Sequence, residues 1–158
     1  MDDSKGATWA MDNKKSSRAT FATRRILIVD GHPLMRRGLT ALIDNEPDLS
    51  VCAAVATYRA GVEAIASSRP DLVITEVLLD GVDGIGLVRE ICSHFRDLRV
   101  MVLTMQDGSR YAGRVLRAGA SGYVTKQDTA ETLLMGIRCL LDGQRYVSPT
   151  VGADRHAI

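Results

Sequence analysis

The stretch Ile26-Leu27-Ile28-Val29-Asp30-Gly31-His32-Pro33 decides the fold of this 158-residue chain. Four consecutive apolar residues, three of them β-branched, are typical of a short strand that is buried on both faces of a parallel sheet. The strand ends at a carboxylate, Asp30, and Pro33 then suits the first turn of a helix. The stretch therefore predicts a buried strand that leads directly into a helix, with polar residues at the junction.

The same alternation of strand and helix continues along the chain. The expected strands are residues 26–29, 49–55, 72–74, 100–103 and 122–125. The expected helices are 33–43, 58–68, 85–94, 111–118 and 130–142, with Gly143 capping the last of them. Alternation at this spacing requires parallel strands joined by right-handed helical crossovers. We therefore expect an α/β protein whose open sheet is covered by helices on both faces and carries its site at the carboxyl ends of the strands.

Composition limits the classes of protein that the chain can belong to. The hydrophobic fraction of 46% and charged fraction of 25% are typical of a globular domain, and no long apolar run suggests a membrane span. The first 25 residues lack the apolar core of a signal peptide, so we expect a cytoplasmic protein. Three widely spaced cysteines indicate neither a disulfide framework nor a zinc site. The net charge of +1 gives no electrostatic reason to expect nucleic acid as a partner.

The chain is long enough for one domain with tails. Residues 1–23 lack apolar periodicity and are expected to form a flexible N-terminal arm. Residues 24–149 are expected to form the ordered domain, and residues 150–158 a C-terminal tail or a truncated linker. The three histidines do not cluster in sequence with other ligands, so no metal site is expected from them.

Four polar residues follow or end the predicted strands: Asp30, Glu76, Thr104 and Lys126. Because the carboxyl ends of parallel strands lie at one edge of the sheet, we expect these side chains to meet there. A buried carboxylate beside a lysine at such an edge can be a structural ion pair or part of a functional site.

Three segments resemble one family, the receiver domains of two-component response regulators. Residues 26–39 resemble the opening segment of these domains, residues 71–84 their phosphoacceptor segment, and Ala118-Gly-Ala-Ser-Gly-Tyr-Val-Thr-Lys126 their final strand with its lysine. The last of these segments is typical of the subgroup that is usually fused to a LuxR-type helix-turn-helix domain, and so is the segment Gly-Gln-Arg-Tyr-Val-Ser-Pro (143–149). These 158 residues do not include such a domain. The resemblance implies a flavodoxin-like, doubly wound sheet of five parallel strands in the order 2-1-3-4-5.

The resemblance also implies a phosphorylation chemistry from which this sequence departs. A working receiver uses an aspartate as the phosphoryl acceptor and holds Mg²⁺ with that aspartate and two acidic residues after the first strand. Here Glu76 stands at the acceptor position, and Gly31 replaces the second acidic residue. Mg²⁺ needs short distances and near-octahedral geometry, so its binding is expected to be weak, and no cofactor and no enzymatic activity are expected.

Two interpretations of Glu76 remain open at this point. Its longer side chain could mimic the phosphorylated state by reaching Lys126 and Thr104, or it could form an ion pair with Lys126 in an inactive site. Asp80, which stands where the family usually has proline, is expected to share the acidic pocket with Asp30 and is the alternative acceptor. Tyr123 occupies the family's aromatic switch position, with Thr104 as its partner.

The leading functional hypothesis is a receiver-like signalling module that works without phosphorylation, through protein-protein contacts, in two-component signal transduction or transcription regulation. Its expected partners are a second copy of the chain and a sensor histidine kinase or other signalling protein. Self-association is expected through the first and fifth helices, or through the face of the fourth helix, fifth strand and fifth helix, because the apolar stripe of helix 130–142 is wider than one sheet contact needs. The alternative is a conventional Mg²⁺-dependent receiver with an atypical acceptor. An unrelated enzyme on a flavodoxin-like fold is a third class, for which the loop after the first strand lacks suitable residues.

Overall fold

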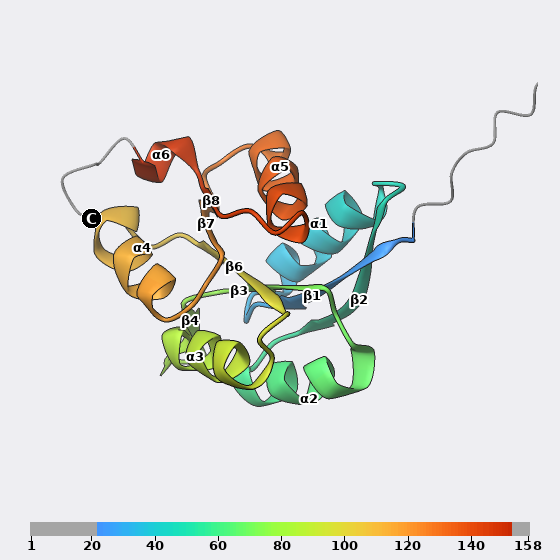
Figure 1. The fold of residues 1–158 in the computed structure, drawn as a ribbon, viewed down its shortest axis with the longest axis horizontal. Helices are drawn as coiled ribbons and strands as arrows, with labels where there is room; N and C mark the ends of the chain where they lie inside the picture. The colour runs from blue at the N-terminus through green and yellow to red at the C-terminus, as the bar shows by residue number, and fades with distance from the viewer. Residues whose placement is uncertain (1–21, 153–158) are drawn as a thin grey trace, which may run out of the picture.

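The computed structural model describes residues 22–152, which form a parallel sheet between two layers of helices (Figure 1). The elements follow in this order: β1 (Arg24–Val29), α1 (Pro33–Asp44), β2 (Leu49–Val55), α2 (Tyr58–Ser68), β3 (Leu72–Thr75), β4 (Leu78–Leu79), β5 (Val82–Asp83), α3 (Gly84–His94), β6 (Arg99–Thr104), α4 (Gly108–Arg117), β7 (Gly122–Thr125), α5 (Ala130–Leu141), β8 (Tyr146–Val147) and α6 (Pro149–Gly152). The α/β class predicted from the sequence is confirmed.

The order of strands in the main sheet is β2-β1-β3-β6-β7-β8, and every neighbouring pair is parallel. The five expected strands lie in the expected order, 2-1-3-4-5, as β2-β1-β3-β6-β7, but the expected number of strands was wrong, because a sixth strand, β8, extends the sheet. β8 is only two residues long and pairs with β7 through Gly122 and Tyr123. Its brevity explains why periodicity did not reveal it, since two residues carry no alternation.

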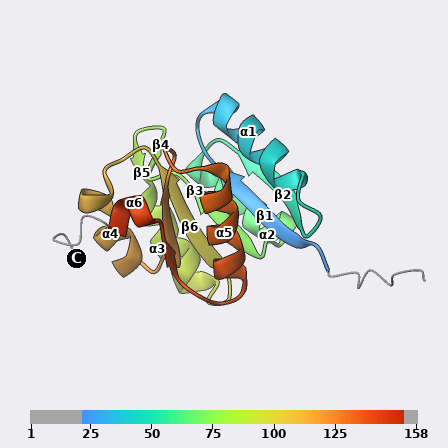
Figure 2. The same cartoon turned by 90° about the horizontal axis from the view of Figure 1, so that it is seen from above.

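Successive residues of β1 point into two different cores. Ile26 and Ile28 belong to the core under α1 and α5, whereas Leu27 and Val29 belong to the core shared by α2, α3 and α4. In Figure 1, α1 and α5 lie above the sheet and α2 and α3 below it, and Figure 2 looks onto the α1 and α5 side. Both faces of the strand are covered by helices and buried from solvent, which is why its sequence is a continuous apolar run rather than an alternating one.

Most helices begin and end close to the expected residues. α2 has the expected bounds, while α4 begins three residues earlier than expected, at Gly108. Gly143 has a φ of 85° and donates its N–H to the carbonyl of Leu140, while Gln144 donates to that of Cys139. This is a Schellman motif, and it confirms Gly143 as the capping residue of α5.

Two expectations about apolar faces were wrong. Leu34 belongs to the apolar periodicity that predicts the helix at residues 33–43, but it is 84% exposed, because it lies in the first turn of α1 and points away from the sheet. The leucine-rich stripe of α5 was expected to exceed what one sheet contact needs, but all five of its residues pack on the core beneath α1 and α5. They are Leu133, Leu134, Ile137, Leu140 and Leu141.

Short elements at two places were not expected. β4 and β5 form an antiparallel hairpin whose two turn residues, Asp80 and Gly81, have φ values of 50° and 74°. Positive φ at both central positions suits a tight hairpin turn, for which Asp-Gly is a favoured pair. The other place is the end of the described chain, with β8 and α6. There the N–H of Ser148 donates to the carbonyl of Tyr123, and Val151 is buried against Gly108 at the start of α4.

Some expectations concern residues that the structure does not describe. The N-terminal arm up to residue 21 and the end of the chain after Gly152 lie outside the described part. Residues 150–152, expected in a tail or linker, belong to α6. Within residues 22–152, no helix has the length and apolar character needed to cross a membrane.

Candidate functional site

The four polar residues expected at the strand ends are held at one edge of the sheet by backbone hydrogen bonds. The N–H of Glu76 donates to the carbonyl of Val29 at 3.1 Å, and that of Lys126 donates to the carbonyl of Thr104 at 2.9 Å. These bonds continue the ladders of β3 and β7 by one residue, so the strand register fixes where the side chains project. The site is therefore built on the hydrogen-bonded backbone of the sheet.

Asp30, Glu76 and Lys126 form a buried ion-pair cluster. Lys126 Nζ lies 2.6 Å from Asp30 Oδ2 and 2.8 Å from Glu76 Oε2. The three side chains are between 3% and 6% exposed. One ammonium thus bridges two carboxylates that are screened from water, which makes the attraction stronger than that of a surface pair and makes loss of any member costly.

The second oxygen of each carboxylate is also occupied. Glu76 Oε1 accepts a hydrogen bond from the N–H of Val77 at 2.6 Å. Asp30 Oδ1 accepts one from the N–H of His32 at 2.8 Å and lies 3.0 Å from His32 Nδ1. Within residues 22–152 no buried side-chain nitrogen or oxygen lacks a hydrogen-bond partner. The cluster is therefore satisfied by groups of the protein itself.

The ion pairs shift the pKa values of Asp30 and Lys126 toward their charged forms. Burial by itself raises the pKa of Asp30, but the hydrogen bonds from Lys126 and His32 outweigh burial and hold the pKa below its usual value. Burial by itself lowers the pKa of Lys126, and the hydrogen bonds to Asp30 and Glu76 outweigh it and raise the pKa. Lys126 is therefore a charged ammonium at neutral pH.

Thr104 and Tyr123 meet at the backbone of Gln106 rather than at each other. The hydroxyl of Thr104 accepts a hydrogen bond from the N–H of Gln106 at 3.1 Å, and the hydroxyl of Tyr123 donates to the carbonyl of Gln106 at 3.1 Å. Tyr123 is fully buried, and burial, reinforced by the charges of Glu76 and Asp107, raises its pKa. Of the two residues that Glu76 could reach, the structure pairs it with Lys126, whereas the hydroxyl of Thr104 accepts from Gln106 in the turn after β6.

Asp80 lies outside the buried cluster. It occupies the exposed turn of the β4–β5 hairpin, and the ammonium of Lys126 pairs with Asp30 and Glu76 instead. A Cβ atom added to Gly31 would be 3.8 Å from Asp80 Oδ1, which places the Asp80 carboxylate at the rim of the site above Gly31. Of the two residues expected in the acidic pocket, the structure buries Asp30 and leaves Asp80 at the rim.

Sequence reasoning missed Gly84, the residue that lets the hairpin fold back over the site. A Cβ atom at Gly84 would be 2.4 Å from the carbonyl oxygen of Glu76 and 2.7 Å from that of Val77. Only glycine permits this approach, which brings the start of α3 against the residue that follows β3. The available signal was a glycine directly before the helix expected at residues 85–94.

The site contains too few acidic side chains in reach of one another for a divalent ion. Within the described residues no three His, Cys, Asp or Glu side chains are arranged to hold a metal. The space between the carboxylates of Asp30 and Glu76 is taken by the ammonium of Lys126. The residues present therefore do not fit the Mg²⁺ ion that the family implies, since a cation would have to displace the ammonium.

Comparison with known proteins agrees with this architecture. The profile of the response regulator receiver domain matches residues 26–138. The transcriptional regulatory protein DegU of Brevibacillus brevis is 30% identical over 127 residues, which cover 80% of this chain and 54% of DegU. The oxygen regulatory protein NreC of Staphylococcus epidermidis is 33% identical over 127 residues, covering 78% of this chain and 57% of NreC. The chain thus spans little more than half the length of these relatives.

Solved structures show the same fold. A two-component response regulator of the LuxR family from Aurantimonas superposes with a TM-score of 0.80 at 34% identity, covering 84% of this chain and 95% of that one. The isolated receiver domain of RcsB from Salmonella enterica superposes with a TM-score of 0.77 at 24% identity, covering 83% and 97%. With a profile match over most of the ordered chain and the strand-end site in the expected place, the protein belongs to the family of two-component response regulator receiver domains.

Proposed function

We propose that this receiver domain signals without being phosphorylated, because its site is closed by its own ion pairs. The observation that carries the proposal is the position of Lys126, whose ammonium contacts both Asp30 and Glu76. In that arrangement the lysine neutralises carboxylate charge that a metal ion would otherwise balance. The domain then has one stable arrangement of its site rather than two.

The chemistry of phosphoryl transfer supports the same conclusion. The acceptor must present an unhindered carboxylate oxygen in line with the leaving group. Both oxygens of Glu76 already accept hydrogen bonds, from Lys126 and from the N–H of Val77. An attack by either oxygen would break a buried, charge-assisted contact before any new one forms. Glu76 is thus a structural partner of Lys126. If the proteins that bind this domain recognise the ion-paired state of the site, Glu76 also takes the place of a phosphorylated residue.

The metal that would assist the transfer has lost part of its site. Gly31 offers no carboxylate, and Asp80 is held in the turn of a hairpin at the rim. Without the ion, the charge of an incoming phosphoryl donor is opposed by Asp30 and Glu76. We propose, therefore, that neither Mg²⁺ nor phosphate changes the domain.

A direct test compares the natural chain with a variant in which both departures from the family pattern are reversed. The chain and the double variant Gly31→Asp, Glu76→Asp are incubated with acetyl phosphate and Mg²⁺, and the adduct is measured by intact mass. A side chain fits at Gly31, because a Cβ there has only ordinary contacts at 3.8 Å, to the carbonyl oxygen of Ala56 and to Asp80 Oδ1. The natural chain is expected to stay unmodified, and the double variant to gain a phosphoryl group.

A stable adduct on the natural chain, mapped to Glu76 or Asp80, would contradict the proposal and favour a conventional receiver with an atypical acceptor. Beryllofluoride with Mg²⁺ gives a second readout, because it forms a phosphoryl-like adduct with an aspartate. We expect unchanged amide chemical shifts in the natural chain and shifts around residues 104–108 in the double variant, since Gln106 joins Thr104 to Tyr123.

The partners of the domain are proposed on the same basis. Relatives such as DegU are named transcriptional regulatory proteins, and this chain spans 54% of that protein. We propose a role in transcription regulation or two-component signalling through protein contacts, with a second copy of the chain as the first partner. A sensor kinase, if it binds, would act here as a docking partner and not as a phosphate donor.

A further inference from the structure

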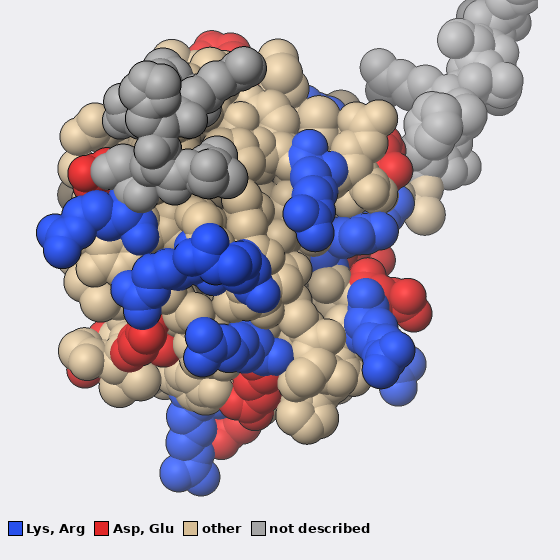
Figure 3. All heavy atoms as spheres, turned by 60° about the vertical axis from the view of Figure 1, so that its left-hand side comes forward, with Lys and Arg blue, Asp and Glu red and all other residues tan. Residues whose placement is uncertain are grey.

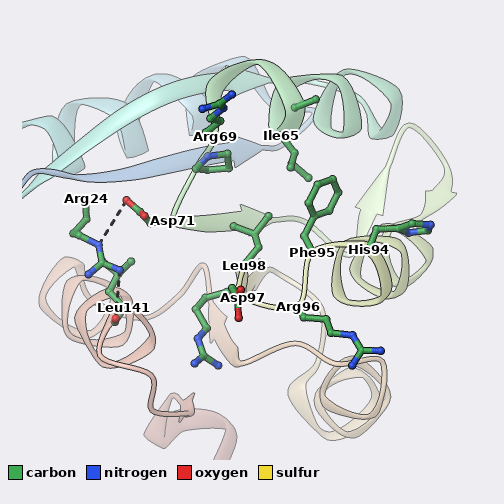
Figure 4. A pocket seen from close by; sticks show the side chains of 13 residues that line it. Arg24, Ile65, Arg69, Asp71, His94, Phe95, Arg96, Asp97, Leu98 and Leu141 are labelled. Carbon is green, nitrogen blue, oxygen red and sulfur yellow. Dashed lines mark hydrogen bonds and ion pairs between the residues drawn. The ribbon is translucent and has the colours of Figure 1, made fainter.

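A hollow in the described part of the surface lies at the opposite end of the sheet from the ion-pair cluster (Figure 4). It has a volume of about 750 Å³ and opens at the amino ends of β1, β3 and β6, bordered by the ends of α2, α3 and α5. A volume of several hundred Å³ is the usual size of a site for a small organic molecule. The signalling proposal makes no use of this pocket.

Arginine dominates the charged lining of the pocket. Four arginines line it, together with two aspartates. Arg24 and Asp71 satisfy each other, with Nε and Oδ2 3.6 Å apart, and Arg24 also donates to the carbonyl of Leu141. The guanidinium groups of Arg69, Arg96 and Arg99 make no hydrogen bond or ion pair with any residue in the described range 22–152. Three unpaired guanidinium groups against the single remaining carboxylate, Asp97, leave the pocket positive.

The left-handed backbone at Arg69 marks the same place. Its φ of 47° is a conformation that glycine adopts with little strain and that a residue with a Cβ atom adopts at a cost. Arginine nevertheless caps α2 there and lines the pocket. An arginine therefore occupies a position where a helix end by itself would favour glycine.

One wall of the pocket is apolar. Ile65, Phe95 and Leu98 line the same side of the pocket in Figure 4. The side chain of Phe95 is 38% exposed. An exposed aromatic ring beside guanidinium groups suits a planar ligand, because the ring offers a stacking surface and the arginines bind phosphate in a forked geometry.

A second hollow of about 460 Å³ continues the pocket past Arg96 and Arg99, which line both. Ser93, Ser121 and the backbone at Gly119 line this continuation. Arg96 and Arg99 thus stand between two hollows and are reachable from either. Figure 3 shows that Lys and Arg side chains also gather on the face that bears α4, where Arg110, Arg114 and Arg117 are exposed. Anions are therefore attracted toward this side of the molecule.

We propose that the pocket binds a phosphorylated small molecule with a planar ring, of the mononucleotide class. Its phosphate binds Arg96 and Arg99, its ring lies on Phe95 and Leu98, and Arg69 closes the rim. An uncharged nucleoside lacks the phosphate contacts, and inorganic phosphate lacks the ring contacts. Both parts of the ligand are needed for binding.

Isothermal titration calorimetry of the full chain at low ionic strength tests this with AMP, adenosine and inorganic phosphate. AMP is expected to bind saturably, and each of the other two at least about tenfold more weakly. The variant Arg96→Ala, Arg99→Ala is expected to weaken AMP binding by about tenfold or more. The variant Phe95→Ala is expected to reduce the difference between the affinity for AMP and the affinity for phosphate. Arg37→Ala, an exposed arginine of α1 away from the pocket, is the matched control and should bind AMP as the natural chain does.

Three results would overturn the proposal. The first is the absence of saturable AMP binding at about 1 mM. The second is equal AMP affinity in the Arg96→Ala, Arg99→Ala variant and the Arg37→Ala control, with thermal unfolding showing that both are folded. The third is that a single-stranded oligonucleotide binds more strongly than AMP, and that this binding is lost in the variant Arg114→Ala, Arg117→Ala but unchanged in the variant Arg96→Ala, Arg99→Ala. That result would assign the positive charge to a nucleic-acid surface on α4.

Discussion

The Nζ atom of Lys126 lies 2.8 Å from Oε2 of Glu76, although the two residues are 50 positions apart and follow different strands. The contact exists because β3 and β7 flank β6 and run parallel, so their carboxyl ends reach the same edge of the sheet. Asp30, from the adjacent β1, completes the cluster from the other side of β3. Three strands thus contribute one charged residue each to a single buried network.

Removal of the ammonium should destabilise the domain strongly. In Lys126→Met the carboxylates of Asp30 and Glu76 lose their shared partner inside the protein, and the free energy of unfolding at pH 7 should fall by about 3–5 kcal/mol. Urea denaturation monitored by circular dichroism measures the change. The triple variant Asp30→Asn, Glu76→Gln, Lys126→Met carries no buried charge and should recover part of that loss. A fall below about 1 kcal/mol in the single variant would mean that the ion pairs contribute little.

The pH dependence of stability follows from the shifted pKa values of Asp30 and Lys126. The pKa of Asp30 lies below its ordinary value of 3.8 in the folded state, so its stabilising contribution is fully present above pH 3.8 and is lost as the pH falls through the folded-state value. The pKa of Lys126 lies above 10.5, so its contribution is present below pH 10.5 and is lost as the pH rises through the folded-state value. Urea unfolding across this range should show a plateau between these limits. In Asp30→Asn the acid limb should become shallower, and an unchanged acid limb would contradict the role of Asp30.

Two glycine substitutions should have opposite effects. Gly84→Ala places a methyl group 2.4 Å from the carbonyl oxygen of Glu76, and backbone atoms cannot move aside cheaply, so stability should fall by about 2 kcal/mol or more. Gly38→Ala, in the middle of α1, meets nothing within 4 Å and should raise stability by about 0.5–1 kcal/mol because alanine favours the helix. Thermal unfolding of both variants measures the difference. A neutral Gly84→Ala would show that the hairpin does not pack on the site.

Self-association is expected through the outer face of α1 and α5. Met135, on α5, is 58% exposed, and Leu34, on α1, is also exposed, whereas the five residues of the α5 stripe pack on the core. Met135→Glu should convert a dimer into a monomer, because one substitution acts twice about a two-fold axis. Sedimentation velocity at high micromolar concentration is the measurement. Met105→Glu, at an exposed methionine in the loop after β6, is the control and should remain dimeric.

Arg138, also on α5, is not a suitable position for that experiment. Its guanidinium contacts Glu46 Oε2 at 2.6 Å and Asp48 at 2.8 Å, and these contacts tie α5 to the loop between α1 and β2. A charge reversal there would disturb the fold itself. A natural chain that stays monomeric at all concentrations, or a Met135→Glu variant that stays dimeric, would rule out this face as the interface.

The sequence by itself determined the α/β class, the alternation of the main elements and the residues at the strand ends. The reason is local: a continuous apolar run is possible only in a strand that is covered on both faces, and the polar residues that interrupt such runs mark where the strands end. The family resemblance rested on the same segments, and the profile match confirmed it. Asp30, Glu76 and Lys126 could therefore be named together before their distances were known.

Only the tertiary structure decided how these residues are used. Whether Lys126 pairs with Asp30, with Glu76 or with both depends on side-chain reach across three strands, which no periodicity encodes. The same holds for Gln106, whose backbone joins Thr104 and Tyr123 through a turn, and for β8, whose two residues are held in the sheet by β7 rather than by their own propensity. The arginine pocket lies beyond sequence reasoning for the same physical reason, because Arg69, Arg96 and Arg99 come from two loops and a strand start that meet only when the sheet is assembled.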